Sequence, residues 1–176
     1  MPLMCYSWGT NDIERRLQFP CDLAFDNYND TYFRGTTIRA SDEIIFRILG
    51  QLRVTMNSFK PFNPSEPIPE SEELVVGWDI MEFFEITSVE NNRHLTIRIK
   101  KGSKESKVYG DVAVSYVVLP ENKEQCRIIV KCLIHYPKVI GLLLRLVLPW
   151  GDLIMMRRQL LSIKRVAEQM QKVSTV

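Results

Sequence analysis

The fold of this chain follows from one stretch near its C-terminal end, DLIMMRRQLLSIKRVAEQM, which spans Asp152–Met170. Apolar residues recur in it at alternating steps of three and four, the spacing that places side chains on one face of an α-helix. They are Leu153, Met156, Leu160, Ile163, Ala167 and Met170. Because a helix in a protein is stabilised mainly by packing of its apolar face, the rest of the chain must offer this helix an apolar surface.

Segments upstream of this helix are predicted to be β-strands. Apolar and polar residues alternate with a period of two over Met81–Val89 and His94–Lys100, as in strands with one solvated face. Two further runs, Val108–Leu119 and Gln125–His135, are separated by the turn-forming residues 120–123, which predicts an antiparallel hairpin. We expect its inward-facing side chains to be Val112, Val114, Tyr116, Val118, Ile128, Val130, Cys132 and Ile134.

The N-terminal part of the chain adds a strand and a shorter helix. Tyr32–Arg39 is rich in β-branched and aromatic residues, which favours a strand. Ser41 is a good helix N-cap residue, and the apolar residues Ile44, Ile45, Ile48 and Leu52 predict a helix from there to Leu52. Four prolines within Lys60–Glu73 exclude a helix or a central strand and predict an irregular connection.

Together these elements predict one α+β domain, in which a curved antiparallel sheet wraps around a long C-terminal helix. The helix after Ser41 closes one end of it. We expect residues 1–30 to be a leader packed on the domain, and residues 31–172 to form the domain itself. A length of 176 residues suits one domain with one sizeable core. A strongly curved sheet around a helix leaves space between the two.

Charge and composition exclude several functional classes. The formal net charge is only +2, so bulk charge does not favour nucleic acid as a partner. The cysteines Cys5, Cys21, Cys126 and Cys132 contain no C-x-x-C pair, and the chain has only two histidines; we therefore expect no metal. Phosphate-binding loops and a G-x-S-x-G elbow are also missing from the sequence, so we expect no cofactor.

The N-terminal residues Met1–Ser7 lack the basic start and apolar run of a signal peptide. This predicts a cytoplasmic protein with free thiols, because reducing compartments keep cysteines unpaired. Cys132 is expected to be a small core residue.

The longest apolar stretch, Val139–Trp150, is interrupted by Arg145 and contains Pro149. It is too short to cross a bilayer, which takes about 20 residues. We favour a helix that faces the core or caps a cavity. Peripheral membrane contact through Leu142, Leu143, Leu144 and Leu146 is the minor alternative.

Several stretches resemble the bacterial polyketide cyclase/START-like family, also known as SRPBCC or helix-grip proteins. They are Trp8–Thr10, Pro20–Asp22, Arg34–Ala40, Leu49–Gln51 and, the most specific, Trp150–Leu160. They occur in the order that the family shows and extend over most of the chain. The resemblance implies a START-like helix-grip fold with an internal hydrophobic cavity. Members of the wider superfamily carry lipids, bind hormones or cyclise aromatic polyketides.

We therefore expect this protein to bind or transport an apolar small molecule or lipid in that cavity. The alternative is a polyketide cyclase/dehydratase-like enzyme that acts in the same cavity. We assign no catalytic residue, because neither His94 nor His135 has a neighbouring nucleophile pattern. The side chains expected to line the cavity are Trp78, Phe83, Tyr116, Met156 and Leu160; the competing interpretation is that they fill a dry core.

Overall fold

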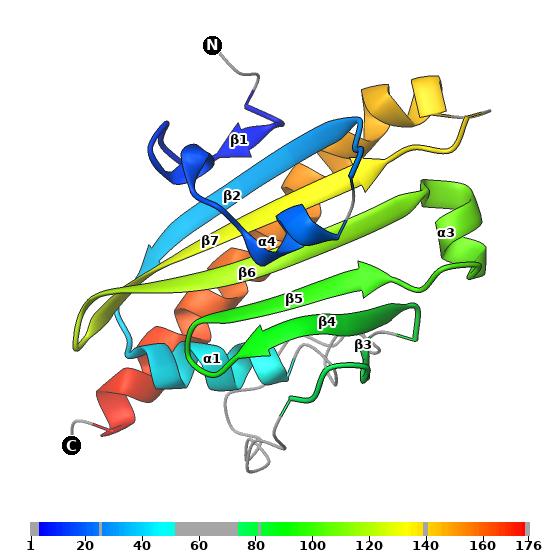
Figure 1. Cartoon of the computed structure of the whole chain (residues 1–176). Coiled ribbons are helices and arrows are strands. Elements are labelled where there is room, and N and C mark those ends of the chain that lie inside the picture. The colour runs from blue at the N-terminus through cyan, green and yellow to red at the C-terminus, as the bar shows by residue number, and fades with distance from the viewer. Residues whose placement is uncertain (1–3, 25, 52–73, 81, 139–140, 175–176) are drawn as a thin grey trace.

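The computed structural model describes residues 4–24, 26–51, 74–80, 82–138 and 141–174 (Figure 1). The predicted irregular connection at 60–73 lies outside these residues. In chain order the elements are β1 (Ser7–Trp8), η1 (Glu14–Arg16), η2 (Pro20–Leu23), β2 (Asp30–Ile38), α1 (Asp42–Gly50), β3 (Asp79–Ile80), β4 (Phe84–Glu90), β5 (His94–Ile99), α3 (Lys104–Tyr109), β6 (Asp111–Asn122), β7 (Gln125–His135) and α4 (Gly141–Ser174).

The strands of the described residues form one sheet in the order β1-β2-β7-β6-β5-β4-β3. Neighbouring strands pair antiparallel, except β1, which runs parallel to β2. β6 and β7 form the predicted hairpin, with Tyr116 opposite Val130 and Val114 opposite Cys132. All eight side chains predicted to face inward from this hairpin belong to the main core cluster, so the alternation in the sequence identified the correct face.

The long helix is confirmed, and it begins earlier than predicted. α4 starts at Gly141, whereas the sequence interpretation began the helix at Asp152. The sequence analysis treated Val139–Trp150 as a separate apolar stretch. Proline removes a backbone donor and breaks many helices. In the structure Pro149 is buried inside α4. Leu144 and Leu148 pack against the core before it, and Met156 does so after it, which holds the helix together through the proline.

One face of the sheet carries α4, and α1 lies at one end of this layer (Figure 1). The Ser41 hydroxyl caps α1 as predicted, accepting a hydrogen bond from the Ile44 N–H at 3.4 Å. The Ser41 N–H donates to Gln171 Oε1 at 3.0 Å, which ties the start of α1 to the last turns of α4. The predicted end of this helix, Leu52, lies outside the described residues.

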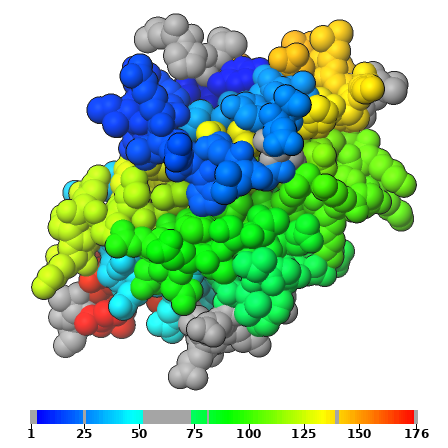
Figure 2. All heavy atoms as spheres, in the orientation of Figure 1, coloured from blue at the N-terminus to red at the C-terminus, as the bar shows by residue number. Residues whose placement is uncertain are grey.

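The N-terminal segment covers part of the opposite face of the sheet, as the blue atoms in Figure 2 show. Phe19 and Cys21 pack there against Ala113, Ile129 and Leu133. These three sheet residues alternate with the inward-facing ones, so the sheet buries side chains on both faces.

The segment between β5 and β6 differs from the prediction. Val108 was expected in a strand, but residues Lys104–Tyr109 form α3, capped by the Ser103 hydroxyl. β6 begins at Asp111, directly after Gly110, whose φ is +84°. Left-handed backbone of this kind is strained for residues with a side chain. The glycine therefore marks the change from helix to strand.

Candidate functional site

Three of the five side chains predicted to line a cavity lie together between the sheet and α4. Tyr116 on β6 and Met156 and Leu160 on α4 are at most 5% exposed. The Tyr116 hydroxyl lies 3.9 Å from Met156 Sδ. Trp78 and Phe83 lie just before β3 and β4 and are partly buried against the same core cluster. Contact of these five residues with a ligand remains a prediction.

A buried ion pair joins the sheet to α4 in this interior. Arg34 on β2 is only 1% exposed, because it occupies an inward-facing position of a strand covered by α4. Its Nη2 donates to Asp152 Oδ2 at 2.6 Å and to the Cys5 carbonyl at 2.8 Å. Its Nη1 donates to the Phe33 carbonyl at 2.8 Å. The guanidinium is thus fixed from three directions.

One donor of this guanidinium is left over. Arg34 Nε is buried and has no hydrogen-bond partner among the described residues. Leaving a buried donor without a partner costs about 1–3 kcal/mol. An acceptor oxygen of a bound molecule would remove that cost.

Burial disfavours ionisation of the acidic groups around Arg34. Burial raises the pKa of Asp152 above its ordinary value, and the charge of Arg34 opposes the rise. Burial also raises the pKa values of Tyr116 and Cys132, and the nearby Asp152 adds to both increases. Tyr116 donates a hydrogen bond to Gln159 Oε1 at 3.0 Å. The guanidinium is therefore the group in this cluster most firmly held in its charged form.

Two tyrosines extend the polar groups from Arg34 toward one end of the molecule. The Arg34 guanidinium lies 5.5 Å from the centre of the Tyr32 ring, within the range of a cation–π contact. The Tyr32 and Tyr136 hydroxyls share a hydrogen bond of 2.5 Å, and burial raises the pKa of both. We call Tyr136, Tyr32, Arg34 and Asp152 the polar line.

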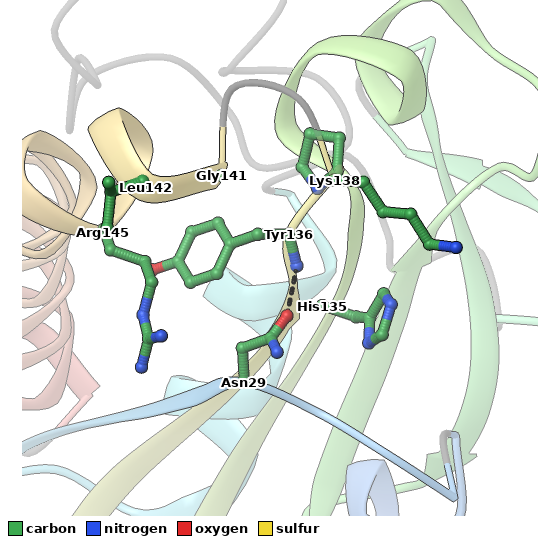
Figure 3. A pocket seen from close by; sticks show the side chains of 8 residues that line it. Asn29, His135, Tyr136, Lys138, Gly141, Leu142 and Arg145 are labelled. Atoms are coloured by element: carbon green, nitrogen blue, oxygen red, sulfur yellow. Dashed lines mark hydrogen bonds between the residues drawn. The ribbon is translucent and has the colours of Figure 1, made fainter.

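The polar line ends at an open pocket of about 320 Å³. Asn29, His135, Tyr136, Lys138, Leu142 and Arg145 contribute to its lining. The Tyr136 N–H donates to Asn29 Oδ1 at 2.7 Å. In Figure 3 the Tyr136 ring lies beside Arg145, whereas His135 and Lys138 point away on the other side. None of the five predicted cavity residues lines this pocket.

The side chains that line this pocket are neutral or basic. Arg145 contacts the carboxylate of Asp30 through Nε and Nη2, at 3.3 Å each, and that half-exposed guanidinium remains open to solvent. Lys138 and His135 add nitrogen groups, and no Asp or Glu is among the described residues that line the pocket. The lining therefore suits an oxygen-bearing or anionic group more than a cation.

The part of the chain that the structure describes contains no ready-made metal centre. In the described ranges, no group of three or more His, Cys, Asp or Glu side chains could hold a metal ion. His94 lies on β5, with its Nε2 2.9 Å from Ser88 Oγ, whereas His135 lines the open pocket. The two histidines therefore belong to separate environments.

Sequence reasoning missed the polar line. Arg34 and Asp152 both lie in stretches that carry the family resemblance, but neither was assigned a role. The available signal was a charged residue at an inward-facing position of the predicted strand Tyr32–Arg39. Its partner lies far away in the chain, and the sequence alone gives no means of pairing the two.

No protein-family model and no curated protein matches this chain. Solved structures do match. A norcoclaurine synthase from Thalictrum flavum has a TM-score of 0.54 and 14% identity, over 80% of this chain and 94% of the synthase chain. A START superfamily protein from Mycobacterium smegmatis has a TM-score of 0.51 and 11% identity, over 80% and 98%. The di-domain ARO/CYC protein BexL has a TM-score of 0.52 and 9% identity, over 80% of this chain and 47% of BexL.

Identities this low establish the fold and nothing further. The chain has the polyketide cyclase/START-like helix-grip fold, a curved sheet held against a long C-terminal helix. The fold expected from the sequence is therefore confirmed.

Proposed function

We propose that this protein binds an apolar small molecule or lipid between the sheet and α4, with an oxygen of that molecule at Arg34. The observation that carries the proposal is the buried Nε of Arg34, which lacks a partner among the described residues. Apolar residues of similar volume usually stabilise a core as well as a buried ion pair does, or better. A buried arginine with a spare donor is thus better explained by recognition than by stability.

The chemistry of the interior limits the ligand class. A carbonyl, carboxylate or phenol oxygen can accept the hydrogen bond that Arg34 Nε offers. The apolar body of the ligand would lie against Tyr116, Met156 and Leu160, whose aromatic and thioether groups adapt to irregular shapes. Trp78 and Phe83 would extend this lining toward β3 and β4.

The open pocket is the proposed entrance. Its Tyr136 side chain belongs both to the pocket lining and to the polar line. A ligand that enters there would meet Tyr32 and then Arg34. The nitrogen groups at the mouth suit the oxygen-bearing end of such a molecule.

The structural comparisons support a small-molecule role without specifying one. A norcoclaurine synthase with the same fold has been solved with dopamine and hydroxybenzaldehyde, and BexL is a di-domain ARO/CYC protein of a biosynthetic pathway. Their chemistry belongs to those proteins, because one fold hosts many functions.

An enzyme of the cyclase/dehydratase kind is the second candidate. The raised pKa of Asp152 and its nearness to Tyr116 favour it, because a protonated carboxyl group in an apolar site can act as a general acid. Binding remains the preferred function because Arg34 already engages the Asp152 carboxylate.

Two adjacent leucines on α4 give a matched test. Leu160 is fully buried and Leu161 is 41% exposed. We expect native mass spectrometry of the purified protein to detect a retained apolar compound, and the probe 8-anilinonaphthalene-1-sulfonate to bind the emptied protein. Leu160→Trp should abolish both signals with little loss of stability, and Leu161→Trp should preserve them.

Two outcomes would redirect the interpretation. If Leu160→Trp destabilises the protein by roughly 1–3 kcal/mol, as overpacking of a filled core does, and wild-type protein binds no apolar compound, the binding proposal fails. If incubation with the retained compound yields a chemically altered product, the cyclase/dehydratase-like enzyme becomes the supported function.

A further inference from the structure

From Gly141 to Trp150, α4 carries apolar residues at every position except Arg145. Leu144 and Leu148 pack against the core. The opposite side carries six apolar residues that are each 50–80% exposed, namely Leu142, Leu143, Leu146, Val147, Trp150 and Ile154. We call these six the apolar stripe. A wide apolar helix surface is normally covered by protein or by membrane.

The apolar stripe is one continuous surface. At 3.6 residues per turn, its six positions fall within an arc of about 140° of the helix circumference. Figure 1 shows the start of α4, in gold, extending past the ends of the strands, and Figure 2 shows the same turns at the upper edge of the molecule. Contiguous exposed apolar surface of this kind marks an interaction site.

The charges around the stripe are basic. Arg145, Arg157 and Arg158 are exposed residues of the same helix; Arg145 also contacts the Asp30 carboxylate, and Arg157 lies over the Trp8 ring. Between Gly141 and Ala167 the only acidic residue of α4 is Asp152, and it is paired with the buried Arg34. A partner with an apolar surface and negative charge beside it would match both features of this part of α4.

We propose that the apolar stripe docks on the surface of an anionic phospholipid bilayer. The stripe would lie at the boundary between headgroups and acyl chains, with Trp150 at the depth that tryptophan prefers. Arg157 and Arg158 would face the anionic headgroups. No described helix is long and apolar enough to cross a membrane, so the contact is with one leaflet.

Charge decides against a second copy of the chain as the occupant. A two-fold dimer places the same surface patch of both copies face to face. In such an interface residue i of one copy contacts residue j of the other, so Arg157 and Arg158 of one copy would meet only apolar or basic residues of the other copy's stripe, and their unpaired charges oppose association. An anionic bilayer satisfies the same apolar surface and neutralises those charges.

The docking surface adjoins the open pocket. Leu142 belongs to the stripe, and it also lines the pocket with Arg145. Docking would bring the pocket mouth to the bilayer surface. The membrane proposal stands independently of any ligand in the interior, because it rests on exposed residues alone.

Vesicle flotation tests the proposal with the full chain. Vesicles of phosphatidylcholine alone are compared with vesicles of phosphatidylcholine and phosphatidylglycerol. We expect binding to the anionic vesicles, weaker binding at high salt, and a blue shift in fluorescence that Trp150→Phe removes. Leu146→Glu with Val147→Glu should lower the partition coefficient by at least about tenfold for each side chain removed from the bilayer.

The control is Leu23→Glu with Ile13→Glu, which changes two exposed apolar residues outside α4 and should leave binding intact. Circular dichroism checks that each variant is folded. The proposal is overturned if wild-type protein does not bind the anionic vesicles, or if the stripe variant binds as well as the control. It is also overturned if light scattering shows a dimer that the stripe variant dissociates and that does not bind vesicles.

Discussion

Arg34 on β2 and Asp152 on α4 are 118 residues apart in the sequence and form an ion pair with 2.6 Å between Nη2 and Oδ2. This pair links the sheet to the long helix between the two layers. Burial disfavours the ionised form of Asp152 and raises its pKa above the ordinary value. The free energy of unfolding should therefore depend on the Arg34 charge, which stabilises the Asp152 carboxylate.

Replacing Arg34 with methionine should destabilise the protein by roughly 3–5 kcal/mol at neutral pH, because a buried carboxylate is left unpaired. The loss should shrink as the pH falls. Without Arg34 the folded pKa of Asp152 rises further above its unfolded value of about 4. The stability that this carboxyl contributes is then present below that value and is lost as the pH rises through the folded pKa. Urea unfolding at a series of pH values measures the effect.

A second arginine–aspartate pair between the same two elements provides the control for this experiment. Arg145 on α4 contacts Asp30 on β2, but its guanidinium is half exposed. Arg145→Met should change stability far less than Arg34→Met does, since exposed ion pairs contribute little. Equal losses in the two variants, or a loss in Arg34→Met that does not vary with pH, would contradict the role assigned to Asp152.

All four cysteines should be unreactive in the folded protein. Each is at most 6% exposed, and burial raises the pKa values of Cys21 and Cys126 to about 11. At pH 8 only about one such thiol in a thousand is then ionised, and the thiolate is the reactive form. Ellman's reagent should give no rapid reaction with native protein and four thiols per chain in guanidinium chloride. Rapid release from the native state would identify an exposed thiolate that the structure does not contain.

The sequence predicted those parts of the fold that depend on local periodicity. The strand Gln125–His135 has the predicted bounds, because an alternating apolar run defines both its length and its inward face. The start of α4 was placed wrongly at Asp152; the helix begins at Gly141 and continues through Pro149, where Leu148 packs against the core. The Arg34–Asp152 pair could not be predicted at all, because strand and helix patterns carry no information on which distant residues meet.

Gly110 should tolerate alanine much less well than another glycine of positive φ. Its φ of 84° and ψ of −161° lie in a region that is essentially restricted to glycine. A Cβ there would lie 2.0 Å from the His135 carbonyl oxygen, so the backbone next to the open pocket would have to move. Gly102 also has a positive φ, of 80°, but a Cβ there would meet nothing within 4 Å.

We expect Gly102→Ala to destabilise the protein by roughly 1–2 kcal/mol from backbone strain. Gly110→Ala should destabilise it by roughly 1–3 kcal/mol more, because of steric overlap. Guanidinium unfolding of the two variants measures the difference, and equal destabilisation would show that the approach of Gly110 to His135 is not as close as described.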